Sequence, residues 1–149
     1  MSVITVRALN SDDRAAWEPL WRGYLDFYRT SQTAELKDLV WRRILDAGEP
    51  IHGLAAVAEG RIIGIVHYVF HRATWSATDY CYLEDLFTSP DARGKGVGRA
   101  LIEAVYERAR VHGSTRVYWL THETNAPARL LYDQVAEFAG FIQYRKAIG

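Results

Sequence analysis

The sequence predicts an α/β (α+β) fold in which a mixed, mostly antiparallel and twisted sheet of about six or seven strands is flanked by four helices. Two observations predict this class. Strand-like runs occur near the N-terminus and again between residues 52 and 88, and the segments around them repeat apolar residues at helical spacing. A chain of 149 residues with 49% apolar content suits one real core, so residues 1–149 are expected to form a single domain.

The chain opens with a predicted strand and a predicted helix. Residues 2–9 alternate apolar and polar side chains, as a strand does. The pair Asn10–Ser11 can cap the first helix, and apolar residues recur at helical spacing from Trp17. Pro19 interrupts that pattern, so we expect the helix either to begin near Glu18 or to kink there.

The next segment predicts a second helix and three antiparallel strands. Residues 34–47 carry an apolar stripe, which Gly and Pro residues end. The runs 52–58 and 61–70 are strand-like, and Glu59-Gly60 between them predicts a tight hairpin turn. Residues 79–88 form the third of these antiparallel strands.

The C-terminal part predicts two helices that alternate with two strands. Residues 97–112 have an apolar face and a charged face, as expected for a helix that covers a sheet. A short strand follows at 116–121, then a helix over 125–139 with a proline near its first turn and a glycine after its end. The last strand is predicted at 141–148.

A glycine-rich run, Arg93-Gly94-Lys95-Gly96-Val97-Gly98, joins the strand 79–88 to the helix 97–112. Alternate glycines leave the backbone free of Cβ atoms where a strand leads into a helix, so its N–H groups can converge on an anion. The side chains of Arg93 and Lys95 and the positive end of the helix dipole add to the same field. The run therefore predicts a diphosphate-binding loop.

Two other phosphate-binding motifs fit this run poorly. A Walker loop requires Ser or Thr directly after its lysine, but Lys95 is followed by Gly96. A dinucleotide fingerprint requires a third glycine where this chain has Arg99, and it normally opens a first βα unit. A glycine-rich turn that merely ends a strand remains the structural alternative.

Two longer motifs carry a resemblance to a known family. The stretch from Tyr82 to Leu101 resembles the central motif of the GNAT superfamily of acetyl-CoA-dependent N-acetyltransferases: Gln or Arg, two residues, Gly, one residue, then Gly or Ala. The stretch 118–132 resembles its second motif, in which an Asn opens a helix that carries a Tyr. Leu83-Glu84-Asp85-Leu86 and Val117-Tyr118-Trp119-Leu120-Thr121 look like the spermidine/spermine and yeast histone/polyamine branch.

This resemblance implies the GNAT fold and a site for acetyl-CoA. In the family, the loop amides bind the diphosphate, and pantetheine pairs with the strand before the loop, which splays from its parallel neighbour. An Asn such as Asn125 reaches the pantetheine, although a simple N-cap is its structural alternative. The residues so implied are Leu86, Phe87, Thr88, Arg93, Gly94, Lys95, Gly96, Val97, Gly98, Arg99, Asn125 and Arg129.

The resemblance also implies two catalytic residues. Tyr132 resembles the tyrosine that faces the cofactor sulfur, and a phenol of pKa near 10 could protonate a departing thiolate of pKa roughly 8.5. Packing is its alternative role. Glu84 resembles a Glu that lines the acceptor site, where it can attract a cationic amine and take its proton. Period-two alternation places Tyr82 and Leu86 on the face of Glu84 and puts Asp85, the rival base or a structural carboxylate, on the opposite face.

The implied reaction is acetyl transfer from acetyl-CoA to the primary amine of a small molecule, such as a polyamine or an amino acid, by direct attack in a ternary complex. The predicted acceptor site consists of Tyr24, Phe27, Tyr28, Glu84 and Trp119. A cluster of aromatic side chains can hold a cation, although core packing is the alternative for these rings. A protein acetyltransferase and a non-catalytic acyl-CoA-binding module remain competing functions.

Composition and residue patterns limit the partners that the sequence predicts. Eighteen basic residues balance eighteen acidic ones, which predicts neither a nucleic-acid partner nor a membrane partner. The histidines His67 and His71 fall in a strand-like run without the pattern of a metal site, so no metal is expected. No signal or membrane-spanning pattern occurs, which predicts a cytoplasmic protein. Family members often pair through C-terminal strands, so the resemblance implies a homodimer.

Overall fold

A five-stranded sheet forms the centre of the computed structural model, which describes residues 3–149. The strands lie in chain order: β1 (Thr5–Ala8), β2 (Ile51–Ala58), β3 (Arg61–His71), β4 (Tyr80–Thr88) and β5 (Val117–Tyr118). The first four pair antiparallel, and β5 pairs parallel with β4. The mixed, mostly antiparallel sheet is as predicted, but it has five strands and not six or seven. Ser2 of the first predicted strand lies outside the described residues.

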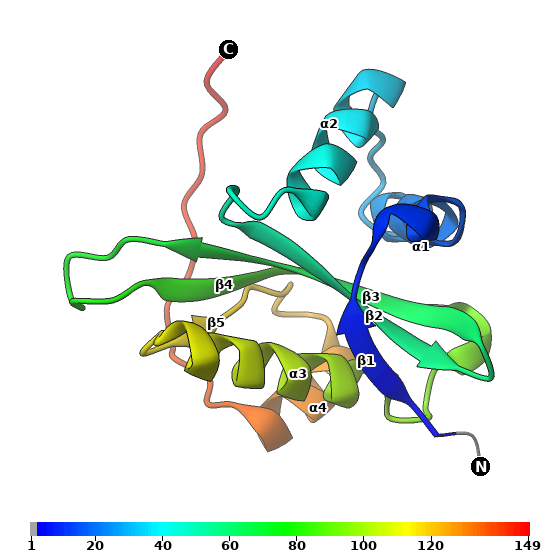
Figure 1. The fold of residues 1–149 in the computed structure, drawn as a ribbon. Helices are drawn as coiled ribbons and strands as arrows, with labels where there is room; N and C mark the ends of the chain where they lie inside the picture. Colours follow the sequence, from blue (N-terminus) through cyan, green and yellow to red (C-terminus); the bar gives the residue numbers. More distant parts are fainter. Residues whose placement is uncertain (1–2) are drawn as a thin grey trace.

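Four helices cover the two faces of the sheet. The helices α1 (Arg14–Phe27) and α2 (Ala34–Leu45) lie on one face, and α3 (Val97–His112) and α4 (Ala126–Val135) lie on the other (Figure 1). Single 3-10 turns at 11–13 and 90–92 precede α1 and the glycine loop. Each face has its own core, because the apolar stripe of each covering helix packs on one side of the strands.

The first helix begins earlier than expected. Asn10 caps the turn at 11–13: its side chain accepts a hydrogen bond from the backbone of Asp12, and its own amide donates to Asp13. The α-helix then starts at Arg14 and not near Glu18. Pro19 lies inside α1, so the predicted start at the proline is wrong.

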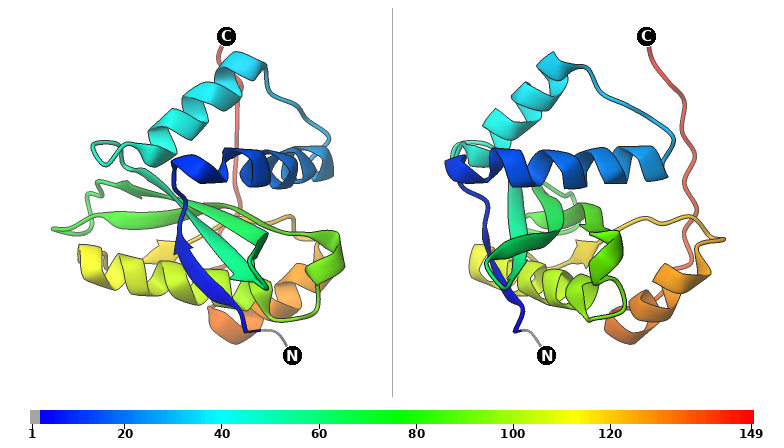
Figure 2. Two further views of the ribbon diagram at one scale, coloured as in Figure 1. Left: turned by 45° about the vertical axis from the view of Figure 1, so that its right-hand side comes forward. Right: turned by 90° about the vertical axis from the view of Figure 1, so that its right-hand side faces the viewer.

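The C-terminal part departs most from the prediction. The helix α4 ends at Val135 and not at residue 139, and β5 contains two residues. Residues 136–149 form neither helix nor strand, so the predicted strand 141–148 is wrong in this structure. The segment leaves α4 and extends past the sheet to the level of α2 (Figure 2). A strand needs a partner, and β5 offers only a two-residue ladder.

Candidate active site

The parallel pair β4 and β5 separates within the sheet. Their ladder consists of Cys81 with Val117 and Tyr82 with Tyr118. From Leu83 to Thr88, the edge of β4 that faces away from β3 has no strand partner in the described part of the chain. An open strand edge presents backbone donors and acceptors that an extended ligand can use. The predicted splay is therefore present, and it leads directly toward the glycine loop.

The glycine loop leaves the start of α3 open to an anion. Gly94 (φ +77°) and Gly96 (φ +85°) adopt the left-handed conformation, and no heavy atom lies within 4 Å of the position of an added Cβ. Gly96 is the N-cap of α3, and no side-chain hydrogen bond caps it. The first amides of a helix have no partner within the helix, and here they lie beside the exposed Lys95. These residues fit the diphosphate of CoA.

The three arginines predicted to bind the cofactor are engaged with the protein. Arg93 donates to the carbonyl of Thr88 at 3.2 Å, and its guanidinium lies over the ring of Phe87. Arg99 donates to Gln134 of α4 and lies 4.0 Å from Glu103. Arg129 donates to the carbonyl of Glu123 at 2.8 Å. These contacts hold the arginine side chains against the protein, and Arg93 and Lys95 are both exposed in the loop.

Asn125 occupies the N-cap position of α4 without capping it. Its side chain makes no capping hydrogen bond, whereas its backbone amide donates to His122 at 3.0 Å. The side chain therefore does not act as the simple cap in this structure.

A β-bulge at Glu84 changes the expected arrangement of the two acidic residues. His67 pairs with Asp85 and Tyr68 pairs with Leu83, so Glu84 is the extra residue of β4. The prediction that Asp85 lies on the face opposite Tyr82 is wrong, because the bulge turns Asp85 toward α1. Leu86, predicted to share the face of Glu84, packs instead in the core beneath α3.

Asp85 and Glu84 lie close together at the bulge. The carboxylate of Asp85 lies 3.0 Å from Nδ1 of the buried His67. The pKa of Glu84 is raised, first because its carboxylate is partly desolvated and second because of the charge of Asp85. The hydroxyl of Tyr24 on α1 donates to the backbone carbonyl of Glu84 at 3.4 Å, and burial and Asp85 raise its pKa. No Arg or Lys forms an ion pair with either carboxylate within residues 3–149.

Tyr132 lies on α4, which covers the face of the sheet opposite α1. Burial raises its pKa, and Tyr28 at the end of α1 adds to the shift. The phenol is therefore protonated at neutral pH. The ring of Tyr132 packs against the core between α3 and the sheet.

Aromatic rings at the C-terminal end of α1 form a cluster. The ring centroids of Tyr24 and Tyr28 lie 4.9 Å apart, and those of Phe27 and Tyr28 lie 5.1 Å apart. His122, from the loop after β5, approaches Tyr28 at 5.6 Å. Trp119, predicted to bind the acceptor, instead contacts Tyr106 and Tyr132 on the side of α3 and α4.

Sequence reasoning weighed His67 only as a metal ligand, and it left Asp85 as the rival base or a structural carboxylate. Two consecutive acidic residues in the middle of an apolar strand were the available signal for Asp85. The fold brings His122, from the loop after β5, to the ring of Tyr28.

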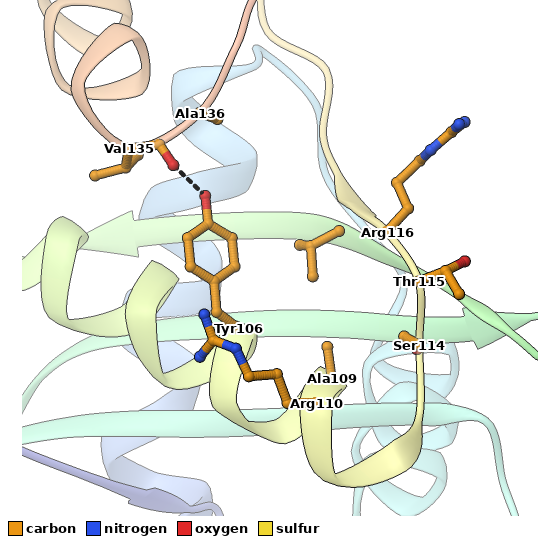
Figure 3. Close-up of a pocket in the computed structure, with 9 residues that line it drawn as sticks. Tyr106, Ala109, Arg110, Ser114, Thr115, Arg116, Val135 and Ala136 are labelled. Carbon is orange, nitrogen blue, oxygen red and sulfur yellow. Dashed lines mark hydrogen bonds between the residues drawn. The ribbon is translucent and has the colours of Figure 1, made fainter.

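A separate groove of about 310 Å³ lies beside β5, away from these residues. Tyr106 of α3 donates across it to the carbonyl of Val135 at 2.7 Å, while Ser114, Thr115 and Arg116 form the opposite wall (Figure 3). None of the predicted site residues lines this groove.

Comparison with known proteins decides the family. The family model described as "Acetyltransferase (GNAT) family" matches residues 15–138. The chain belongs to the GNAT acetyltransferases. It is similar to the D-amino-acid N-acetyltransferase HPA3 of Saccharomyces cerevisiae, with 37% identity over 96% of this chain and 90% of that protein. It also resembles the thialysine N-epsilon-acetyltransferase of Caenorhabditis elegans, with 32% identity over 57% of this chain and 52% of that protein.

Solved GNAT structures share the fold. AAC(6')-Iy in complex with a bisubstrate analog, CoA-S-monomethyl-acetylneamine, superposes with a TM-score of 0.84 at 21% identity over 99% of this chain and 100% of that one. The GNAT membership and these relatives make this chain an acetyl-CoA-dependent acyltransferase of the N-acetyltransferase type. The fold class and the superfamily predicted from the two motifs are confirmed.

Two negative findings concern the part of the chain that the structure describes. None of its helices combines the length and the apolar character that crossing a bilayer requires. No cluster of three or more His, Cys, Asp or Glu side chains with the arrangement of a metal site occurs within residues 3–149.

Proposed function

We propose that this GNAT enzyme acetylates the primary amine of a small molecule, by direct attack of the amine while acetyl-CoA is bound. One observation carries the proposal: at the bulge of β4 lie two neighbouring carboxylates, Glu84 and Asp85, with which no Arg or Lys of residues 3–149 forms an ion pair, and aromatic residues of α1 lie on the same side. A primary ammonium fits such a site by charge and by its affinity for aromatic faces. The relatives named for D-amino acids and thialysine support a small acceptor.

Acetyl-CoA supplies the activated acetyl group. The backbone of Leu86, Phe87 and Thr88 would hold its extended arm, while the amides of 94–99 and the side chain of Lys95 would hold its diphosphate. Asn125 contributes its unused carboxamide, and Arg129 keeps the start of α4 in place through Glu123.

Glu84 and Tyr132 would handle the protons. A primary ammonium with a pKa near 10.4 must lose a proton before it can attack. The raised pKa of Glu84 makes its carboxylate a stronger base for that proton. The raised pKa of Tyr132 keeps its hydroxyl protonated, so it can donate a hydrogen bond and then a proton to the leaving sulfur.

The acceptor would lie against Tyr24, Phe27 and Tyr28, with its ammonium at Glu84 and Asp85. Trp119 would act indirectly, because its contacts support Tyr132. A free D-amino acid is the acceptor class we favour, since the similarity to the yeast enzyme extends over nearly the whole chain.

We also propose that the enzyme is a homodimer. Phe141 (87% exposed), Ile142 (76%), Tyr144 (91%) and Ile148 (87%) extend into solvent at the C-terminus. The far edge of β5 has no strand partner in the described chain. Pairing this segment with a second copy would bury the apolar residues and protect the edge.

A CoA-release screen tests the function. Acetyl-CoA is offered with D-amino acids, L-amino acids, thialysine, spermidine and a histone peptide, and we expect turnover in the D-amino-acid or thialysine wells. Release only with the peptide would make the enzyme a protein acetyltransferase, and silence in every well would overturn the proposed reaction. A thermal-shift series complements the screen: CoA should raise the melting temperature, whereas NAD and ADP should leave it unchanged.

A further inference from the structure

A chain of hydrogen bonds runs from the buried Trp17 of α1 to the bulge of β4. The indole N–H of Trp17 donates to Nε2 of His67 at 3.0 Å, and Nδ1 of His67 lies 3.0 Å from Oδ2 of Asp85. Trp17 is 0% exposed and His67 is 1% exposed, whereas the side chain of Asp85 is 15% exposed. The chain thus begins in the interior and ends at the acceptor side of the sheet.

The hydrogen bond from Trp17 determines which nitrogen of His67 carries the proton in its contact with Asp85. An indole N–H can only donate, so Nε2 of His67 must accept and carries no proton. The remaining proton of the neutral ring is then on Nδ1, which donates it to Asp85. A neutral imidazole that donates to a carboxylate leaves the negative charge on Asp85.

Within residues 3–149, no Arg or Lys forms an ion pair with Glu84 or Asp85. Asp85 touches His67, Glu84 lies next to Asp85 on β4, and Tyr24 of α1 faces Asp85. Trp17 and Trp21 of α1 present indole rings to His67, and Gly53 of β2 presents no side chain. The two carboxylates at the bulge, Glu84 and Asp85, therefore keep their negative charge.

We propose that Trp17 and His67 are positioning residues for the acceptor site: through their hydrogen bonds they hold Asp85 as a fixed anion beside Glu84, and the two carboxylates together receive the ammonium group of the acceptor. This inference rests on the proposed function, because it assigns the bulge to the amine. In an even ladder that kept Glu84, Asp85 would face the core beneath α3, so the chain of bonds and the bulge act together.

Kinetics with D-phenylalanine and with thialysine test the assignment. His67→Phe keeps a ring but removes the donor to Asp85, and we expect it to raise KM for the amine about 10-fold while kcat changes little and the Kd for CoA stays constant. His67→Asn restores an N–H near the position of Nδ1 and should recover part of the loss. The matched control is His52→Phe: His52 of β2 stacks on Tyr68 and makes no contact with Asp85, so its KM should stay at the wild-type value.

A variant of Trp17 gives a second, independent readout. Trp17→Phe removes the N–H donor to Nε2, so the ring of His67 can take the tautomer whose Nδ1 has no proton for Asp85. We expect KM for the amine to rise in Trp17→Phe relative to the wild type, in the same direction as in His67→Phe.

The ring nitrogens of His67, observed by nitrogen-15 NMR in the free wild-type enzyme, provide a readout that does not depend on turnover. We expect the Nδ1–H tautomer in the wild type at pH 7, and signals of the Nε2–H tautomer in Trp17→Phe. A doubly protonated wild-type ring at pH 7 overturns the inference. So does an unchanged KM in His67→Phe in an enzyme that turns over. An enzyme without turnover on any amine, but with the expected tautomer, would overturn the acceptor role and the proposed function together while leaving the bond chain in place.

Discussion

The ring of Tyr132 meets the ring of Trp119 nearly edge-on, with centroids 5.3 Å apart and an interplanar angle of 67°. This contact links the start of the loop after β5 to α4, and it involves the ring of Tyr132 and not its hydroxyl. The packing role and the proposed chemical role of this tyrosine therefore reside in different atoms, and they can be separated by mutation.

Tyr132→Phe should leave the fold and the Kd for CoA nearly unchanged, because the edge-on contact with Trp119 is kept. The turnover number should fall by about 10²–10⁴-fold, the usual contribution of a positioned acid. Steady-state kinetics and calorimetric titration with CoA measure the two effects. Trp119→Phe serves as the control, since it alters the packing and leaves the hydroxyl in place. Near-wild-type turnover of Tyr132→Phe would remove the acid role.

Glu84→Gln should slow acetylation most at neutral pH and approach the wild-type rate as pH rises. The physical reason is that the amine deprotonates by itself near its pKa of about 10.4, so the base becomes unnecessary. Full pH–rate profiles of both proteins on one acceptor measure this convergence. A defect of the same size at every pH would contradict the base role, and a raised KM with constant kcat would indicate attraction of the cation alone.

The same substitution should stabilise the protein at neutral pH. The pKa of Glu84 is raised in the folded state, so the folded protein holds this proton more tightly than the unfolded chain. Its ionisation therefore costs stability as pH rises above the unfolded value of about 4.3. Melting temperatures should show Glu84→Gln above the wild type at pH 7, with the difference vanishing below about pH 4. A lower melting temperature at pH 7 would contradict the direction of the shift.

Two glycines in the same conformation separate backbone strain from ligand binding. Gly96 (φ +85°) lies in the predicted CoA loop, whereas Gly60 (φ +72°) lies in the β2–β3 turn, and both have open space where a Cβ would stand. Alanine at either position should cost about 1–2 kcal/mol of stability, because left-handed backbone is strained for residues with a Cβ. Gly96→Ala alone should weaken CoA binding in a calorimetric titration. Equal CoA affinity of both variants would mean that the loop is only a turn.

The homodimer can be tested by light scattering. We expect a dimeric mass for the full chain, and a monomeric mass after Phe141→Asp together with Ile142→Asp, because charges at these exposed apolar positions disfavour burial. A monomeric mass of the unmodified chain over a wide concentration range would contradict the proposal.

Local signals were sufficient for most of the fold. Asn10 caps the first turn, and Glu59 and Gly60 adopt positive φ in the predicted hairpin. The glycine run joins β4 to α3 as predicted. Each of these features depends on a few neighbouring residues, so the sequence pattern alone identifies it.

The features that depend on distant partners were not predictable in the same way. Both Glu84 and Asp85 are acidic, so the polar–apolar pattern of β4 does not reveal which residue is the extra one. The indole of Trp17 is fifty positions from His67 in the chain, and only the packing of α1 on the sheet joins them. The segment 141–148 has the composition of a strand, but pairing depends on an edge that its own sequence does not describe.

The extra residue in β4 places the two halves of that strand in opposite phases. Before it, the odd-numbered Cys81 and Leu83 enter the core beneath α3; after it, the even-numbered Leu86 does so, and Phe87 faces α1. Deleting position 84 itself would restore an even ladder and keep Leu86 and Phe87 on their present faces, because Asp85 would still pair with His67. At this position the strand can therefore lose a residue without exchanging its two faces, and homologous chains that lack the bulge should align here with a gap of one residue.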